Sequence, residues 1–212
     1  PDTLYNHGCA LNSLGDIDGA RERFKQVLAR EPDYGKAHFE MGLLELDAGN
    51  LNEALPHVLA ARRALPGDPE THYNLGLIRQ QQGLEVNAMR HFVEALNLEP
   101  SHYGANRSAG PILRSWGDAT GALACLDIAI THADEDANLH YERGMSLYAL
   151  GRYEEAAEAL QRAYDLAPDV ARTWNNLALV QQALGQYDSA LQHFKRYLEK
   201  HPEDDTVRTS YG

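Results

Sequence analysis

The chain has 212 residues, of which 43% are hydrophobic and 24% charged, and its formal net charge is −12. The acidic balance argues against a nucleic-acid partner, because phosphate binding needs clustered lysine and arginine. The sequence holds no run of about 18 apolar residues, so no membrane insertion is expected.

The main feature of the sequence is a period of 34 residues that starts at Pro1 and continues without insertions. Six repeats follow one another, numbered one to six in chain order: residues 1–34, 35–68, 69–102, 103–136, 137–170 and 171–204. In repeat three, apolar residues have helical spacing before Gly83 and again before Pro100. Each repeat is therefore predicted to form two helices, the first ended by a glycine and the second by a proline.

Five positions, counted from 1 in each repeat, carry this pattern. Position 8 is glycine or alanine, position 15 glycine, position 20 alanine, position 24 large and apolar, and position 32 proline except in repeat four. A small residue at position 8 lets the two helices approach closely, although glycine inside a helix costs about 0.5–1 kcal/mol. Glycine at position 15 ends the first helix in a left-handed conformation. Alanine at position 20 lies where the helices cross, and proline stops the second helix.

Capping residues are also predicted at several helix starts. Asp68 precedes Pro69, a good combination for the first helix of repeat three. The candidate caps of second helices are Asp18, Asn52, Thr120 and Asp188.

This pattern resembles the tetratricopeptide repeat, and the resemblance covers residues 1–204. It implies an all-α fold, a right-handed superhelical solenoid of stacked antiparallel helix pairs over residues 1–212. Residues 205–212 again place Tyr211 and Gly212 at positions 7 and 8, so a seventh repeat or a capping helix is expected to start there. Because the chain begins at Pro1 without methionine and stops inside this helix, we expect it to be a fragment of a longer protein.

Repeat four departs most from the pattern. Pro111 lies in the middle of its first predicted helix, where proline removes a backbone donor and leaves the carbonyl of Arg107 unpaired. The repeat also contains four glycines and lacks the proline at position 32. One interpretation, which we favour, is a kink tolerated by the neighbouring repeats. The other is a bend that divides repeats one to three from repeats five and six.

The resemblance also implies a concave groove, lined by the first helices through positions 2, 5, 6, 9, 12 and 13. A peptide segment of a partner protein is expected to bind there, because aromatic rings supply contact area and amide side chains can bond its backbone. The implied groove residues are Tyr5, Asn6, Phe39, Leu43, Tyr73, Asn74, Leu77, Gln80, Arg107, Arg114, Tyr141, Met145, Tyr148, Arg172, Asn175 and Asn176. Over the six positions, five acidic and four basic residues make the groove nearly neutral.

Charged residues on this face have two interpretations. Arg107, Arg114 and Arg172 could form a basic spot that receives a carboxylate or phosphate of the ligand. Alternatively, Glu142 neutralises Arg107. At position 11 of consecutive repeats, a glutamate and an arginine could pair across the repeat interface: Glu45 and Arg79.

Histidines recur at two positions of the repeat. Three of them share position 4 and are predicted to face the preceding repeat: His38, His72 and His140. Packed helices lie about 8–10 Å apart, too far for these rings to share a metal ion bound at about 2 Å, so no metal site is expected. Three more lie on second helices and are predicted to be exposed on the outer face: His57, His91 and His193.

No motif for chemistry is evident, because phosphate-binding loops, dinucleotide-binding glycines and paired-cysteine metal sites are all missing from the sequence. Cys9 and Cys125 lie more than three repeats apart, so no internal disulfide is expected and a reducing compartment such as the cytoplasm is favoured. We expect no enzyme activity and no cofactor. The first hypothesis is a non-catalytic protein-interaction scaffold. The alternatives are the substrate-recruiting region of a larger enzyme, of glycosyltransferase, sulfotransferase or hydroxylase type, and a scaffold that assembles with copies of itself.

Overall fold

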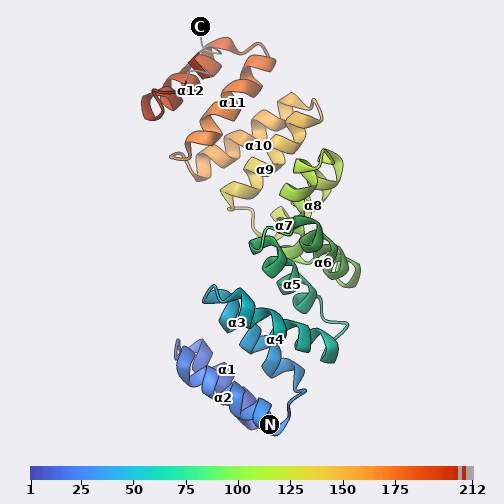
Figure 1. Cartoon of the computed structure of the whole chain (residues 1–212). Helices are drawn as coiled ribbons and strands as arrows, with labels where there is room; N and C mark the ends of the chain where they lie inside the picture. Colours follow the sequence, from blue (N-terminus) through green and yellow to red (C-terminus); the bar gives the residue numbers. More distant parts are fainter. Residues whose placement is uncertain (205–206, 209–212) are drawn as a thin grey trace. The chain divides into compact units, whose positions relative to one another are not determined.

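A computed structural model describes residues 1–204 and 207–208 (Figure 1). Each repeat contains one pair of helices, and no strand occurs among the described residues. The first helices are α1 (Asp2–Ser13), α3 (Gly35–Asp47), α5 (Pro69–Gln81), α7 (Tyr103–Ser115), α9 (Ala137–Ala149) and α11 (Ala171–Ala183). The second helices are α2 (Ile17–Arg30), α4 (Leu51–Ala64), α6 (Glu85–Leu98), α8 (Ala119–His132), α10 (Tyr153–Leu166) and α12 (Tyr187–Lys200). The all-α prediction is thus confirmed, whereas Tyr211 and Gly212, on which the expected seventh repeat rests, lie outside the described residues.

The chain forms two compact bodies, an N-terminal body of residues 1–105 and a C-terminal body of residues 106–212. Their boundary falls inside α7. In the N-terminal body each helix from α1 to α6 packs on the next one along the chain, and in the C-terminal body the helices from α8 to α12 do the same. Stacking of sequence neighbours is the defining property of a solenoid. One continuous solenoid over both bodies stays a prediction.

Glycine at position 15 ends every first helix, as predicted. All six of these glycines have positive φ angles, between 74° and 88°, which glycine adopts without steric cost. In repeat one, the backbone N–H of Asp16 donates to the Leu11 carbonyl and that of Gly15 to the Asn12 carbonyl, both at 2.9 Å. These two bonds form a Schellman motif that satisfies the last carbonyls of α1.

The small residue at position 8 is required by the residue at position 24 of the same repeat. A Cβ atom added to Gly76 would lie 2.4 Å from the ring of Phe92, and one added to Gly42 would lie 2.5 Å from Val58. Both of these larger side chains are fully buried. The other pairs with this contact are Gly8 with Phe24, Gly110 with Leu126, and Gly144 with Leu160. The predicted close approach of the two helices is therefore confirmed.

Ring nitrogens at position 4 bind the carbonyl at position 32 of the preceding repeat. The pairs are His38 with Pro32 at 2.8 Å, His140 with Asp134 at 2.7 Å and Trp174 with Pro168 at 2.8 Å. Because a carbonyl oxygen only accepts, both histidines carry a proton on Nε2. The prediction that position-4 histidines face the preceding repeat is confirmed for His38 and His140. His72 differs, since its Nδ1 is buried without a hydrogen-bond partner among the described residues.

The prediction of exposed histidines on the second helices is wrong. His57, His91 and His193 are each half-buried, and burial lowers the pKa of all three rings. They occupy position 23, which faces position 4 across the helix pair. Nδ1 of His57 lies 2.9 Å from Nδ1 of His38, and the ring centroids of His91 and His72 are 6.3 Å apart.

The second helices begin earlier than predicted, so their expected caps lie inside them. Asp16 caps α2 by accepting from the N–H of Gly19 at 2.9 Å, and Asp118 caps α8 by accepting from Gly121 at 2.8 Å. The residues wrongly predicted as caps are Asp18, Asn52, Thr120 and Asp188. The reason is that no linker separates the helices, because the residue after the position-15 glycine both completes the Schellman motif and caps the next helix. Asp68 caps α5 as predicted, accepting from the N–H of Thr71 at 3.0 Å.

Repeat four keeps the helix lengths of the other repeats. α7 spans 13 residues with Pro111 inside it, the same length as α5. α8 ends at His132 although Asp134 replaces the usual proline. α4 also contains a proline, Pro56, which the sequence pattern had not singled out.

Candidate functional site

The first helices of repeats one to three converge on a cavity of about 400 Å³ in the N-terminal body. Its lining comes from α1, from one face of α3, from the first turn of α5 and from the loop between α4 and α5. The lining residues are Tyr5, Lys36, Phe39, Glu40, Leu65, Asp68 and Glu70. We call this space the groove cavity.

Helix spacing and the repeat period explain how these side chains meet. Lys36, Phe39 and Glu40 are three and four residues apart, so they lie on one face of α3. Tyr5 and Phe39 both occupy position 5 in neighbouring repeats. The structure thus brings together two of the predicted groove residues, an aromatic pair from consecutive first helices.

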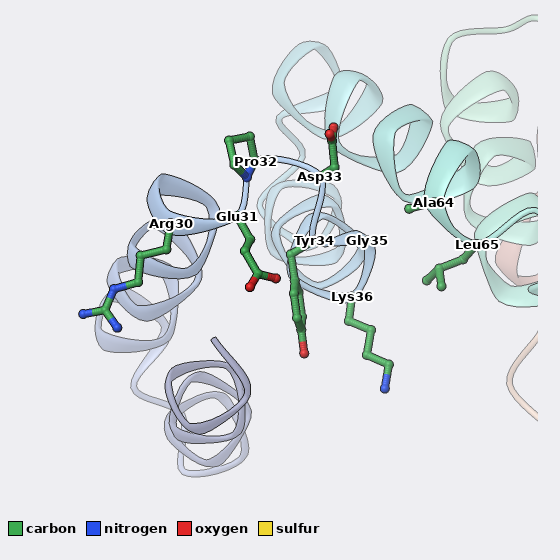
Figure 2. Close-up of a pocket in the computed structure, with 9 residues that line it drawn as sticks. All are labelled: Arg30, Glu31, Pro32, Asp33, Tyr34, Gly35, Lys36, Ala64 and Leu65. Atoms are coloured by element: carbon green, nitrogen blue, oxygen red, sulfur yellow. The ribbon is translucent and has the colours of Figure 1, made fainter.

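A second cavity, of about 580 Å³, shares Lys36 and Leu65 with the first. Its remaining lining is Ala64 and residues 30–35, which are the loop between α2 and α3 with the last residue of α2 and the first of α3. Figure 2 shows the side chains of Glu31, Tyr34 and Lys36 extending to the same side of this loop, whereas Asp33 extends to the other. We call this space the loop cavity.

Acidic side chains dominate the two cavities. Their combined lining contains five carboxylates and two cations, which are Arg30 and Lys36. The carboxylates are Glu31, Asp33, Glu40, Asp68 and Glu70. The nearly neutral groove predicted from the sequence rests on a count of positions on first helices only. Three of the five carboxylates lie on loops instead, so that count missed them.

Hydrogen bonds hold the acidic and phenolic groups of this region in place. The hydroxyl of Tyr5 donates to Oε1 of Glu40 at 3.3 Å, and burial raises the pKa of the Glu40 carboxyl, opposed by this hydrogen bond. The hydroxyl of Tyr34 donates to Oδ1 of Asp2 at 2.6 Å, which raises the pKa of Tyr34 to about 12. Burial also raises the pKa of the Cys9 thiol, the opposite of what an activated nucleophile needs.

The other predicted groove residues of the N-terminal body do not line the groove cavity. Asn74 is buried and its amide donates to the Glu70 carbonyl at 2.8 Å. The Tyr73 ring packs 6.0 Å from Phe92 and 5.1 Å from His102. The remaining ones are either exposed, as Asn6 and Gln80 are, or half-buried, as Leu43 and Leu77 are.

In the C-terminal body, predicted groove residues form a network around Tyr141. The amide of Asn176 donates to the Tyr141 hydroxyl at 2.8 Å. The guanidinium of Arg172 lies 4.3 Å from the centroid of the same ring and donates to Oδ1 of Asn138 at 2.6 Å. Met145 packs beside Tyr141 on the core.

Two further predicted residues lie outside this network. The Tyr148 ring is 36% exposed and lies 5.5 Å from the ring of Tyr153. Asn175 is half-buried, and its Oδ1 has no hydrogen-bond partner among the described residues.

The three predicted arginines each have a partner inside the chain. Arg114 binds Glu142 through two hydrogen bonds, of 2.9 and 3.1 Å, whereas Arg107 binds Asp136 at 3.2 Å. With Arg172 engaged by Tyr141, an open basic spot is not what the structure shows. The alternative prediction was that Glu142 neutralises Arg107. Glu142 does neutralise an arginine of α7, but that arginine is Arg114. The predicted pair of Glu45 and Arg79 is also wrong: Glu45 lies 3.1 Å from Arg21, and Arg79 donates to Gln82.

Two family models of the tetratricopeptide repeat match this sequence, one over residues 5–69 and 39–105 and the other over residues 135–203. The chain belongs to the tetratricopeptide repeat family. Its helix pairs, its position-15 glycines and the contact between positions 8 and 24 account for that match physically.

Curated relatives are similar over most of the chain. The BBSome complex member BBS4 of Bos taurus is 26% identical over 85% of this chain and 28% of its own length. The protein O-mannosyl-transferase TMTC1 of Homo sapiens is 28% identical over 97% of this chain and 24% of its own length. The chain therefore spans about a quarter of the length of these relatives.

Several solved structures superpose well on the chain. MamA of Desulfovibrio magneticus RS-1, from residue 41 to its end, has a TM-score of 0.69 and 26% identity, covering 80% of this chain and 97% of that one. YrrB, described as a TPR protein with an unusual peptide-binding site, has a TM-score of 0.80 over 88% of this chain and 96% of that one. At 16% identity, the likeness to YrrB shows the fold alone.

Other kinds of site are not evident among the described residues. Residues 1–204 and 207–208 contain no cluster of three or more histidine, cysteine, aspartate or glutamate side chains arranged to hold a metal ion. Within the same residues, every helix is too short or too polar to cross a membrane. Cys9 and Cys125 are free thiols.

Proposed function

We propose that this chain is a protein-interaction scaffold whose N-terminal body binds a peptide segment of a partner along the groove cavity and the loop cavity. The observation that carries the proposal is the groove cavity itself, where Tyr5 from repeat one and Phe39 and Leu65 from repeat two face one space. Aromatic side chains provide large contact area with few rotatable bonds, which is why they dominate binding energy at interfaces.

The two cavities suit an extended peptide better than a small ligand. They share Lys36 and Leu65 and run from the loop between α2 and α3 to the start of α5. An apolar side chain of the peptide would rest against Phe39 and Leu65, and the Lys36 ammonium could bond peptide carbonyls. Two of the similar proteins support this role by description: YrrB has a peptide-binding site, and BBS4 is a member of a complex.

Photo-crosslinking tests the location of the site. A photo-reactive phenylalanine analogue is placed at position 39, and the matched control carries it at Tyr148, an exposed predicted groove residue of the C-terminal body. We expect the analogue at position 39 to crosslink to a partner from lysate. In a separate pull-down, we expect Phe39→Ala to reduce the amount of the same partner that is bound. Capture at position 148 alone, with Phe39→Ala folded and binding normally, would show that the groove cavity is not the binding surface.

A second candidate function is recruitment of a substrate within a larger glycosyltransferase. It is favoured by the similarity to the O-mannosyl-transferase TMTC1, which covers 97% of this chain. In that case the peptide in the groove cavity would be an acceptor for sugar transfer. The natural full-length protein separates the two functions: transfer of sugar to the bound partner, lost in Phe39→Ala, supports recruitment, and a partner that stays unmodified supports the scaffold.

Self-assembly, the third hypothesis from the sequence, stays a prediction. Sedimentation at several protein concentrations tests it, because an assembling scaffold gains mass with concentration. A monomer at every concentration would remove the hypothesis.

A further inference from the structure

We infer that the groove cavity selects an arginine side chain of the bound peptide. This inference rests on the proposed peptide-binding function and adds the chemistry of the residue that is recognised. Three features carry it: the excess of carboxylates in the cavity, the oxygens that these carboxylates leave unused, and the comparison of Tyr5 with Tyr141.

The groove cavity has three carboxylates and one cation. Glu40, Asp68 and Glu70 face the same space as Lys36, and the ammonium of Lys36 makes no ion pair with any described residue. An acidic peptide side chain entering this space would be repelled, whereas a cation would gain two or more opposite charges at short range.

Each carboxylate uses one oxygen to hold the fold and leaves the other available. Oε1 of Glu40 accepts from Tyr5, Oδ2 of Asp68 accepts from Thr71, and Oε1 of Glu70 lies 3.2 Å from Nε2 of His102. The second oxygen of each group takes no hydrogen bond from another described residue. A ligand with several N–H donors therefore suits the cavity, and a guanidinium has five in a planar fork.

In the C-terminal body an arginine side chain lies over the ring of the position-5 tyrosine, Tyr141. There Arg172, at position 2 of repeat six, lies over the ring of Tyr141, at position 5 of repeat five, with 4.3 Å between the guanidinium carbon and the ring centroid. In the N-terminal body the equivalent residues are Lys36 and Tyr5, and no cation lies over the Tyr5 ring among the described residues. Lysine lacks the planar group that stacks on the ring. No internal guanidinium takes at Tyr5 the place that Arg172 fills at Tyr141. Tyr5 instead lines the cavity next to the unused oxygen of Glu40, with the tilted ring of Tyr34 at a centroid distance of 5.6 Å.

The experiment selects peptides and then varies one residue. Phage-displayed random dodecapeptides are selected on the whole chain, and peptides that lose binding to Phe39→Ala are kept. We expect these peptides to share an arginine. In fluorescence anisotropy, replacing that arginine with glutamine should weaken binding by about tenfold or more, as expected for the loss of charge-assisted hydrogen bonds. Replacement with lysine should give an intermediate affinity.

Glu70→Gln identifies the partner of the arginine with little risk to folding, because the Glu70 side chain is 55% exposed. It should reduce the difference between the arginine and glutamine peptides, whereas Glu53→Gln, an exposed charge change on α4 outside both cavities, should leave the difference unchanged. Phe39-dependent peptides without a shared arginine, or an arginine peptide that binds no better than its glutamine form, would overturn the inference and leave the proposed function standing. A selection that yields no Phe39-dependent peptide would contradict both.

Discussion

The amide of Asn176 donates a hydrogen bond of 2.8 Å to the hydroxyl of Tyr141, which lies 35 residues earlier in the chain. Tyr5 and Glu40 have the same separation and are also bonded, with the phenol as donor. Position 5 of one repeat therefore meets position 6 of the next. Asn74 shows what happens without a hydroxyl opposite it: position 5 of the previous repeat is a phenylalanine, and Asn74 turns back to the Glu70 carbonyl.

Removal of this amide should weaken the C-terminal body. Asn176→Ala is expected to lower the free energy of unfolding by about 1 kcal/mol, the usual net value of one hydrogen bond. Urea unfolding followed by helical circular dichroism measures the loss. The matched control is Asn175→Ala, whose Oδ1 has no partner among the described residues and should cost little. Tyr141→Phe should add almost nothing to Asn176→Ala, so fully additive losses would show that the two groups are not coupled.

The glycine at position 8 should resist substitution in repeat three. In Gly76→Ala the new methyl group meets the buried ring of Phe92 at 2.4 Å. Overpacking should destabilise the fold by about 1–3 kcal/mol. The higher helix propensity of alanine stabilises it by only about 1 kcal/mol, so the thermal midpoint of unfolding should fall. Gly67→Ala is the control, because nothing lies within 4 Å of its added Cβ. Equal midpoints for the two variants would contradict the steric explanation.

These contacts explain why so much of the fold can be predicted from the sequence. The same packing contact recurs in each repeat, as between Gly76 and Phe92. The recurrence of a small residue at position 8 and a large one at position 24 therefore predicts this contact from the sequence. Ion pairs are harder to predict from the sequence, because a long charged side chain can reach several neighbouring residues. Arg107 and Arg114 both lie on α7, and only the structure shows that Arg114 is the partner of Glu142.

The candidate site is less predictable because loop residues complete it. Tyr5 and Phe39 follow from the family pattern, but Leu65 and Asp68 come from the end of α4 and the cap of α5. A signal for the histidine pairs was present in the sequence: repeats two and three carry histidine at both position 4 and position 23. Position 23 is not on an outer face, because a second helix such as α4 packs against its own first helix as well as against the first helix of the next repeat.

The two ion pairs of α7 should differ in strength. Arg114→Ala is expected to lower the free energy of unfolding by about 2 kcal/mol, because it leaves the Glu142 carboxylate without its charged partner. The Glu142 side chain is only 9% exposed in that pair. Arg107→Ala removes a pair that is more exposed, at 45% and 23%, and should cost about 0–1 kcal/mol. Urea unfolding of both variants gives the comparison, and an equal loss would show that burial of Glu142 does not set the energy.

Acid should destabilise the N-terminal body through its half-buried histidines. Burial lowers the pKa of His57 below its ordinary 6.5, helped by the neighbouring His38 and opposed by Glu45. Between the folded and unfolded pKa values the unfolded chain binds more protons, so stability rises with pH in that window. Stability should therefore be complete above about pH 7 and fall as the pH drops through about 6.5. The burial-lowered pKa of His91 acts in the same direction.

The matching variant is His57→Gln, measured as the urea midpoint at several pH values between 5 and 8. It should flatten the rise of the midpoint with pH, because the glutamine side chain does not titrate. His7→Gln removes an exposed histidine from α1 and serves as the control. The explanation predicts a flatter profile for His57→Gln than for His7→Gln. Parallel profiles would mean that acid destabilises the chain through other groups, such as the carboxylates around the groove cavity.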